Sequence, residues 1–342
     1  MPCPSPRRAS SAVPAPASSF AVCKRSRPPA PLAEGAGATL AITGATGFLG
    51  THLLQTLSPD RWYLRALSRS GAAFRPDVEL VHGSLTDDEA LAALVRNAEI
   101  VVHAAGLTSA RSAAEFDRVN AEGTARLARA CLAHAPHAHV LLVSSLAARE
   151  PQLSAYAASK RRGEEEARRL LPADRLTVLR LPALYGPHDR ATLAFFKAAR
   201  LPVTPLFTNG NERIALLHGG DAAEAIAGLA ALRTAGTFAL ADAEPAGYSM
   251  RTILDEAGRA QGRRTRFVRV PALAMRTAGW GAGAGARLFR TAAMLSPGKV
   301  REMLHPDWSV SPADLPPGTK ARTLRDGFGE TVAWYHKAGW LR

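Results

Sequence analysis

Hydrophobic positions along the first half of the chain alternate between short apolar runs and helical stripes. Residues at helical spacing occupy Asp87 to Arg96 and Glu115 to His134. Five short apolar or β-branched runs predict strands at Thr39 to Thr43, Trp62 to Leu67, Val78 to Val81, Ile100 to His103 and His139 to Val143. Strands that alternate with helices predict an α/β fold with a doubly wound parallel sheet of the Rossmann type.

The regular alternation ends after the fifth predicted strand. A helix is predicted over Ser154 to Leu171 and a strand over Leu176 to Leu181, but beyond Tyr185 prolines interrupt the chain. We therefore expect a dinucleotide-binding domain over residues 39–185. A smaller mixed C-terminal substrate lobe is expected over residues 186–342, interleaved with returns to the sheet such as Phe238 to Leu240.

The first 38 residues have a different composition. They contain eight prolines and no acidic residue before Glu34, and they show no apolar periodicity with which to build a core. We expect residues 1–38 to be a disordered tail. An organelle transit peptide and a start codon assigned too far upstream are the alternatives.

Composition points to a globular enzyme. With 342 residues, 47% of them hydrophobic, the chain can bury one substantial core and a smaller lobe. No apolar run approaches the roughly 20 residues that span a bilayer, so we expect no membrane partner and a cytoplasmic location, or an organelle if the tail is a targeting signal. The three cysteines are scattered without metal-ligand or disulfide spacing, and no metal is expected.

The net charge of +14 is concentrated in two stretches. Residues 1–38 hold five Lys/Arg against one acid, and residues 251–301 hold eleven against two, which leaves +1 for the rest. The predicted cofactor domain is thus nearly neutral, and no nucleic-acid-binding module is present, so nucleic acid is not an expected partner. The arginines of the second stretch either attract an anionic substrate or form a solvated surface.

A glycine-rich turn follows the first predicted strand. Gly44, Gly47 and Gly50 lie between that strand and a helical pattern. In this setting the first glycine permits a tight turn, the second lets backbone approach a pyrophosphate, and the third lets the helix pack closely on its strand. The turn predicts a dinucleotide site that also includes Thr46, Phe48 and Leu49.

The loops after the next strands supply the other candidate cofactor contacts. Arg69 stands where an NAD-selective site usually has an acidic residue, and a guanidinium there suits the 2′-phosphate of NADP. NADP is therefore the preferred cofactor, with NAD as the alternative. Ser84 and Leu85 could close over the adenine, and the small residues Ala104, Ala105 and Gly106 leave room for the nicotinamide.

Tyr156 and Lys160 are four residues apart on a predicted helix and so share one face. A neighbouring ammonium favours the phenolate and can lower the tyrosine pKa from about 10 toward neutrality. This pair is the candidate acid-base catalyst of a hydride-transfer enzyme.

These motifs occur in the order seen in a known family. The chain resembles the extended or atypical short-chain dehydrogenase/reductase superfamily, often called NAD-dependent epimerase/dehydratases. The resemblance is carried by Thr43 to Gly50, His103 to Gly106, Asn120 before Gly123, Ser144 with Ser145, Tyr156 with Lys160, Arg180 to Pro187, Leu217 to Asp221 and Val332 to Tyr335.

The resemblance implies specific roles. Tyr156 would transfer the proton, Lys160 would hold the nicotinamide ribose, and Ser145, the second serine of the pair, would hydrogen-bond the substrate oxygen. Asn120 would be structural. Family members also pair through two helices, which implies a possible homodimer.

Two departures separate this sequence from the relatives that process nucleotide sugars. Tyr156 lies only eleven positions after Ser145, and Ala183 stands where those enzymes often keep an asparagine. We therefore expect an NAD(P)-dependent oxidoreductase that moves hydride between nicotinamide and a carbonyl or alcohol carbon of a small molecule. A sugar-nucleotide epimerase/dehydratase and a non-catalytic dinucleotide-binding scaffold are the alternatives.

Overall fold

The computed structural model describes residues 37–70, 75–206, 210–271 and 297–341. Most of the predicted tail, the glycine run at 279–285 and the arginines Arg276, Arg287 and Arg290 lie outside the described residues. Among the described residues, no helix is both long and apolar enough to cross a membrane.

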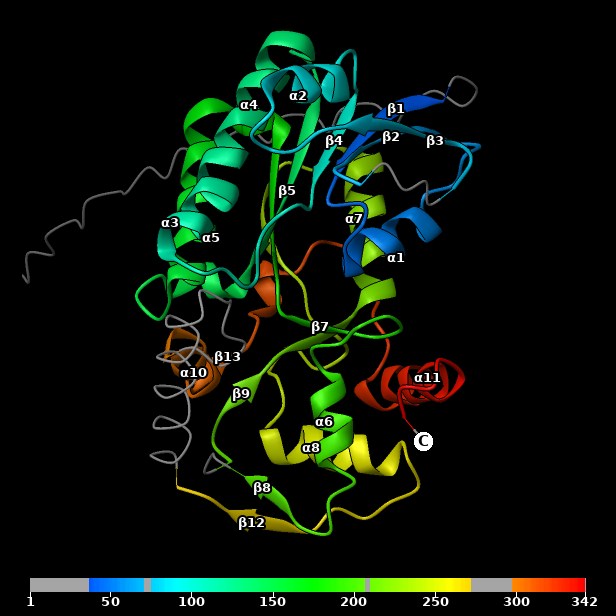
Figure 1. Ribbon diagram of the computed structural model, residues 1–342, viewed down its shortest axis with the longest axis vertical. Coiled ribbons are helices and arrows are strands. Elements are labelled where there is room, and N and C mark those ends of the chain that lie inside the picture. The colour runs from blue at the N-terminus through cyan, green and yellow to red at the C-terminus, as the bar shows by residue number, and fades with distance from the viewer. Residues whose placement is uncertain (1–36, 71–74, 207–209, 272–296, 342) are drawn as a thin grey trace, which may run out of the picture.

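A parallel sheet of seven strands forms the centre of the larger part of the molecule (Figure 1). Its order is β11-β6-β5-β4-β1-β2-β3, so the chain winds outward in both directions from β1, as predicted. The strands are β1 (Ala38–Thr43), β2 (Trp62–Ser68), β3 (Val78–His82), β4 (Ile100–His103), β5 (His139–Ser145), β6 (Leu176–Leu181) and β11 (Gly236–Ala239).

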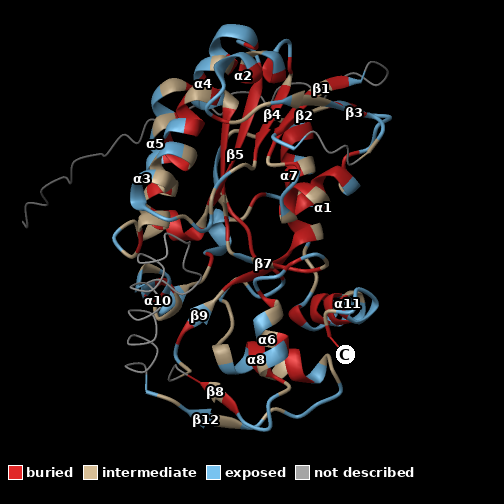
Figure 2. Cartoon of the chain, viewed as in Figure 1, coloured by how far each residue is buried: buried red, intermediate tan, exposed pale blue. Residues whose placement is uncertain are grey.

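Helices cover both faces of this sheet. In β1, Leu40 and Ile42 belong to one buried cluster with α1 and α7, whereas Ala41 belongs to a second cluster with α2 and α4. Successive strand residues point to opposite faces, so a continuously apolar strand serves two cores (Figure 2). The helices are α1 (Phe48–Thr56), α2 (Asp88–Val95), α3 (Ala113–Phe116), α4 (Gly123–His134), α5 (Ala155–Leu170) and α7 (Gly219–Leu232).

The predicted helix over Glu115 to His134 is interrupted. A π-helical turn, η1 (Asp117–Glu122), lies between α3 and α4. Such turns have no signature in apolar spacing, and they often mark functional sites. Short 3₁₀ turns also occur at η2 (Leu146–Arg149), η3 (Ala173–Arg175) and η4 (Pro312–Asp314).

The C-terminal lobe is built around an aromatic core. Tyr185, Phe196, Phe328 and Tyr335 are buried together, and Phe196 packs with ring centroids 4.8 Å from Phe328 and 5.3 Å from Tyr335. The elements of the lobe are β7 (Ala183–Tyr185), α6 (Leu193–Ala198), β8 (Thr204–Leu206), β9 (Arg213–Ile214), β10 (Leu216–His218), α8 (Met250–Arg259), β12 (Phe267–Arg269), α10 (Pro297–Met303), β13 (Asp307–Trp308) and α11 (Leu324–Lys337).

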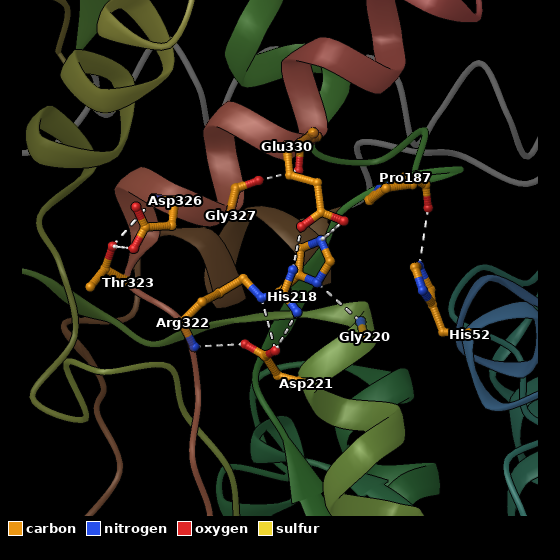
Figure 3. A network of polar contacts seen from close by, with 11 residues as sticks. His52, Pro187, His218, Gly220, Asp221, Arg322, Thr323, Asp326, Gly327 and Glu330 are labelled. Atoms are coloured by element: carbon orange, nitrogen blue, oxygen red, sulfur yellow. Dashed lines mark hydrogen bonds and ion pairs between the residues drawn. The ribbon is translucent and has the colours of Figure 1, made fainter. Parts of the chain in front are cut away.

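A polar network joins the lobe to the sheet domain (Figure 3). His218 caps α7 because its Nδ1 accepts a hydrogen bond from the Gly220 N–H at 3.1 Å. Asp221 at the start of α7 pairs with Arg322 at 2.8 Å, just before α11. On the other side of the joint, His52 of α1 donates from Nε2 to the Pro187 carbonyl at 3.1 Å.

We expect Gly163→Ala to destabilise the protein. A Cβ at Gly163 would lie 2.6 Å from the Asn120 carbonyl oxygen, so α5 would be pushed away from η1 at a cost of about 1–3 kcal/mol. The measurement is the free energy of unfolding from chemical denaturation. Gly228→Ala in α7 is the control, because nothing lies within 4 Å of a Cβ there; it should raise stability by up to about 1 kcal/mol. Equal effects of the two substitutions would contradict the close packing of α5.

Candidate active site

The glycine turn is compressed against the loop that follows β4. Gly44 has a φ of +80°, and a Cβ there would lie 2.6 Å from the backbone nitrogen of Ala105. A Cβ at Gly50 would lie 2.2 Å from the Gly44 carbonyl oxygen. The turn therefore requires glycine at both positions. Gly44 adopts a backbone conformation that favours glycine, and Gly50 lets α1 approach the turn closely.

The start of α1 fits a dinucleotide pyrophosphate. Gly47 is the N-cap and supplies no side-chain acceptor, so the N–H groups of the first turn stay available. A Cβ at Gly47 would meet only the Gly44 carbonyl, at 3.3 Å, which leaves the other side open to a ligand. Leu49 is buried in the core and the Phe48 ring packs 4.9 Å from the His52 ring, so both residues can reach a nucleotide through backbone only.

The sheet order brings most of the predicted cofactor residues to one edge. Because β1 lies between β4 and β2, the turn at Gly44, the loop of Ala104 to Gly106 and Arg69 are adjacent. Arg69 is exposed, and among the described residues it has no acidic partner. Thr46 is exposed on the turn itself, at the same edge.

The loop after β3 is partly turned toward the core. Leu85 is buried, and its Cδ1 would lie 3.0 Å from a Cβ on Gly123 of α4. Ser84 shares a hydrogen bond with Thr86, their oxygens 2.9 Å apart. Of the two predicted contacts in this loop, Ser84 is the one with an accessible side chain.

A buried histidine connects this edge to α4. Thr124 donates to the Asn120 carbonyl at 2.7 Å, so it must accept from Nε2 of His103 at 3.0 Å. Nδ1 of His103 then accepts from the Thr43 hydroxyl at 2.7 Å, and Thr43 Oγ1 accepts from the Ala105 N–H at 3.1 Å. Burial lowers the pKa of His103 to about 3, so the ring is neutral. Its single proton is therefore on Nε2, and the hydrogen bonds have one direction only.

The catalytic candidates converge from α5 and β5. Ser154 caps α5 by accepting from the Ala157 N–H at 2.9 Å. Tyr156 and Lys160 follow on one face of the helix, and Lys160 Nζ donates to the Val143 carbonyl at 2.7 Å. A Cβ at Gly106 would lie 3.7 Å from Nζ, so the ammonium stands beside the loop after β4.

The electrostatics of this pair differ from the sequence-based expectation. Burial raises the pKa of Tyr156, and a side-chain hydrogen bond with Ser145 acts in the opposite direction. Burial lowers the pKa of Lys160 to about 8, and Glu164 opposes that shift. The prediction that Lys160 lowers the tyrosine pKa toward neutrality is wrong for this structure, because burial and the charge of Glu302 raise the pKa of Tyr156 more than the hydrogen bond with Ser145 lowers it.

The two serines at the end of β5 face opposite ways. Ser145 hydrogen-bonds Tyr156, whereas Ser144 donates to Glu164 Oε1 at 2.6 Å. Glu164 is fully buried and also accepts from Arg180 at 2.7 Å and from Arg168 at 3.1 Å. Sequence reasoning missed Glu164, although its position four residues after Lys160 on the same helix was a usable signal.

Asn120 supports the site without entering it. Its side chain accepts from the Leu107 N–H at 2.7 Å and donates to the Leu107 carbonyl at 3.0 Å and to Ser159 Oγ at 2.9 Å. Ser159 in turn donates to the Tyr156 carbonyl at 2.7 Å. The π-helical turn thus fastens the loop after β4 to the catalytic helix.

Apolar residues lie beside two of the catalytic candidates, Ser145 and Tyr156. Ser145 pairs with Leu181 in the sheet, so Pro182 and Ala183 continue past it along the same edge. Ala183 is exposed, and the Phe116 ring lies 5.9 Å from the Tyr156 ring. Phe116 therefore borders Tyr156, Ala183 follows the strand that pairs with Ser145, and the charge of Glu302 also acts on Tyr156.

Comparison with known proteins agrees with these features. The model of the family described as "NAD dependent epimerase/dehydratase family" matches residues 40–238. A ceramide reductase of Caulobacter vibrioides (strain NA1000 / CB15N) is 42% identical over 316 residues, which cover 91% of this chain and 98% of the relative.

Solved structures share the fold at lower sequence identity. The crystal structure of gox2253 aligns with a TM-score of 0.68 and 20% identity over 90% of this chain and 100% of that one. MoeE5 in complex with UDP-glucuronic acid and NAD aligns with a TM-score of 0.65 and 20% identity over 88% and 100%.

The lowered pKa of Lys160 gives a pH-dependent contribution to stability. Between pH about 8 and the unfolded value near 10.4, the unfolded chain binds more protons at Lys160, so this contribution rises with pH in that window. We expect the stability of the wild type relative to Lys160→Met to increase from pH 8 to pH 10 in chemical denaturation. A difference that stays constant or decreases over this window would contradict the buried environment of Nζ.

Proposed function

Since this chain belongs to the NAD-dependent epimerase/dehydratase family, we propose that it catalyses the NADPH-dependent reduction of a ketone in a ceramide-type lipid. It is an NAD(P)-dependent enzyme, an oxidoreductase or epimerase, with a Rossmann-type fold. Net reduction, the preference for NADP and the lipid substrate are the finer statements that we propose.

The relative named a ceramide reductase carries the reductive direction, and the state of Tyr156 is compatible with it. The pKa of Tyr156 lies above the ordinary value near 10, so the phenol is protonated at neutral pH and is ready to donate. A reduction consumes one proton at the carbonyl oxygen, whereas an oxidation needs a base at the same position. A protonated tyrosine that hydrogen-bonds Ser145 fits the first reaction.

The residues of the site divide the chemistry among them. NADPH, when bound, supplies the hydride that reduces the carbonyl carbon. Tyr156 gives its proton to the carbonyl oxygen, and Ser145 donates a hydrogen bond to that oxygen as it gains negative charge. Lys160, held beside Gly106, is placed to hold the ribose and to favour the phenolate left after proton transfer.

The substrate class rests on the relative and on the mouth of the site. A relative of 42% identity that aligns over 98% of its length is named a ceramide reductase. Ceramides carry long alkyl chains, which the apolar Ala183 and Phe116 suit better than they suit a sugar. The sugar-nucleotide alternative has weaker support, from structural neighbours at 20% identity such as MoeE5 and from a UDP-glucuronate 4-epimerase of Arabidopsis thaliana that is 28% identical over 47% of this chain.

A homodimer is a further proposal. An open groove of about 960 Å³ runs over α4 and α5. Three arginines in its walls form ion pairs within the chain, Arg126 with Asp88, Arg162 with Asp117 and Arg169 with Glu166. Because these charges are balanced, two copies can meet over α4 and α5 without strong repulsion, which agrees with the two-helix pairing that the family resemblance implies.

We expect the chain in detergent micelles to oxidise NADPH when offered a ceramide whose secondary alcohol is replaced by a ketone, and not when offered UDP-glucuronic acid. Tyr156→Phe should lower kcat by roughly 10²–10⁴-fold with little change in NADPH affinity, because it removes only the proton donor. Turnover is followed by the absorbance of reduced nicotinamide. Tyr63→Phe, which removes the same hydroxyl from a half-exposed side chain on β2, is the control and should leave the rate unchanged. Wild-type-like turnover by Tyr156→Phe would contradict its role.

Arg69→Asp should reverse the cofactor preference. Removing the guanidinium weakens binding of the 2′-phosphate, and the carboxylate accepts from a ribose hydroxyl. The expected result is a fall in kcat/KM for NADPH of tenfold or more with a gain for NADH. Arg96→Asp, an exposed arginine beyond α2, makes the same charge change elsewhere and should leave the ratio unaltered. An unaltered ratio in Arg69→Asp would remove Arg69 as the selector.

A further inference from the structure

Three of the large aliphatic side chains that the described residues expose lie together at the far end of the lobe. They are Leu201, Val203 and Val268, with exposed fractions of 49%, 47% and 48%. Leu201 and Val203 lead into β8, and Val268 is the middle residue of β12. Both strands lie at the end of the molecule farthest from the seven-stranded sheet (Figure 1).

The pairing of these strands places apolar side chains on one face. β8 and β12 are parallel, and Val268 is the register partner of Pro205. Register partners point to the same side of a sheet, so Val268 and Pro205 share the outer face, while Thr204 and Leu206 are buried on the inner one. Phe267 is held on the inner side by Arg251, whose guanidinium lies 4.3 Å from the centre of the ring.

Positive charge surrounds these side chains. Residues 197–206 and 259–271, called the basic tip from here on, contain seven Lys/Arg and no acidic residue. Within the described ranges, Arg259 is paired with Glu256 at 2.6 Å, but no acidic side chain pairs with the other six. Those six are Lys197, Arg200, Arg263, Arg264, Arg266 and Arg269.

We propose that the basic tip docks on the surface of a bilayer that contains anionic lipids. Unpaired arginines complement the negative headgroups, and exposed aliphatic side chains insert at the boundary with the acyl chains. The proposal deepens the proposed function, since a ceramide-type substrate resides in a bilayer, but the tip can bind vesicles whether or not the site turns over a lipid.

The chemistry of the tip favours a bilayer over the other anionic partners. Single-stranded nucleic acids bind to exposed aromatic side chains on which bases stack, whereas the exposed side chains here are aliphatic. Electrostatic steering of a small anionic substrate requires charge near the site, but the tip lies at the opposite end of the lobe from the seven-stranded sheet (Figure 1). The expectation of no membrane partner rested on the lack of a spanning segment, and docking needs none.

The test is cosedimentation of the full chain with vesicles that lack any ceramide. Wild type should bind vesicles of phosphatidylglycerol and phosphatidylcholine and release in high salt, and it should not bind phosphatidylcholine alone. Arg264→Ser/Arg266→Ser should weaken the partition coefficient by about 25-fold, at about fivefold per arginine. Val268→Asp should weaken it by about tenfold or more.

Matched controls lie on the sheet domain. Arg96→Ser/Arg129→Ser removes the same charge, and Leu232→Asp changes a side chain that is 60% exposed at the end of α7; both should bind as wild type does. An equal loss of vesicle binding in the tip and control variants would overturn the proposal, because binding would then depend only on the net charge of the protein. So would wild-type binding by Val268→Asp, or a preference for single-stranded RNA over anionic vesicles.

Turnover in detergent micelles separates this proposal from the proposed function. Tip variants should keep the micellar rate, since they lie far from Tyr156, and this rate also shows that they are folded. Micellar turnover without vesicle binding would refute the docking surface alone. Vesicle binding without turnover of the ketone would refute the proposed substrate and leave the docking surface in place.

Discussion

The close approach of the turn after β1 to the loop after β4 is the constraint on which the site depends. Gly44 touches the backbone of Ala105, and one step earlier Thr43 is tied to His103 by a buried hydrogen bond. Since His103 is neutral and has a partner on each nitrogen, it admits a single proton arrangement. The same contact sets where Gly106 lies, and Asn120 and Lys160 are both positioned against that residue.

The nucleotide-binding half could be predicted because its patterns are local. Continuous apolar runs predicted the strands of the sheet correctly. The glycines at positions 44 and 50 predicted the turn, and the structure leaves no room for a Cβ at either of them. The choice of Ser145 over Ser144 came from family resemblance, and the alternation of side chains along β5 supplies a physical reason: the first serine faces Glu164.

Features that depend on distant contacts could not be predicted. The π-helical turn at Asn120 follows from where Leu107 and Ser159 arrive in space, not from apolar spacing. The direction of the Tyr156 pKa shift was mispredicted because the helix spacing shows the neighbouring ammonium but not the depth of burial. The basic tip could not be predicted because it is formed by the pairing of β8 with β12, two strands about sixty residues apart in sequence.

The lobe and the sheet domain meet through both apolar and polar contacts. Aromatic packing around Phe328 stabilises the lobe, while Leu217 of β10 belongs to the core of the sheet domain and Leu146 after β5 is buried together with Val310 of the lobe. Polar contacts are added by Asp221 with Arg322 and by the hydrogen bond of His52 to Pro187 (Figure 3).

The position of β11 at the edge of the sheet has a consequence for synthesis on the ribosome. The serine, tyrosine and lysine of the site are all made by residue 160, yet β6 stays an unpaired edge until residues 236–239 emerge. An apolar parallel strand with free backbone groups is a template for pairing with other chains. The nascent enzyme therefore passes through a stage in which its chemistry is fully encoded but its sheet is open to misassembly, and that stage ends only when part of the lobe has also been translated.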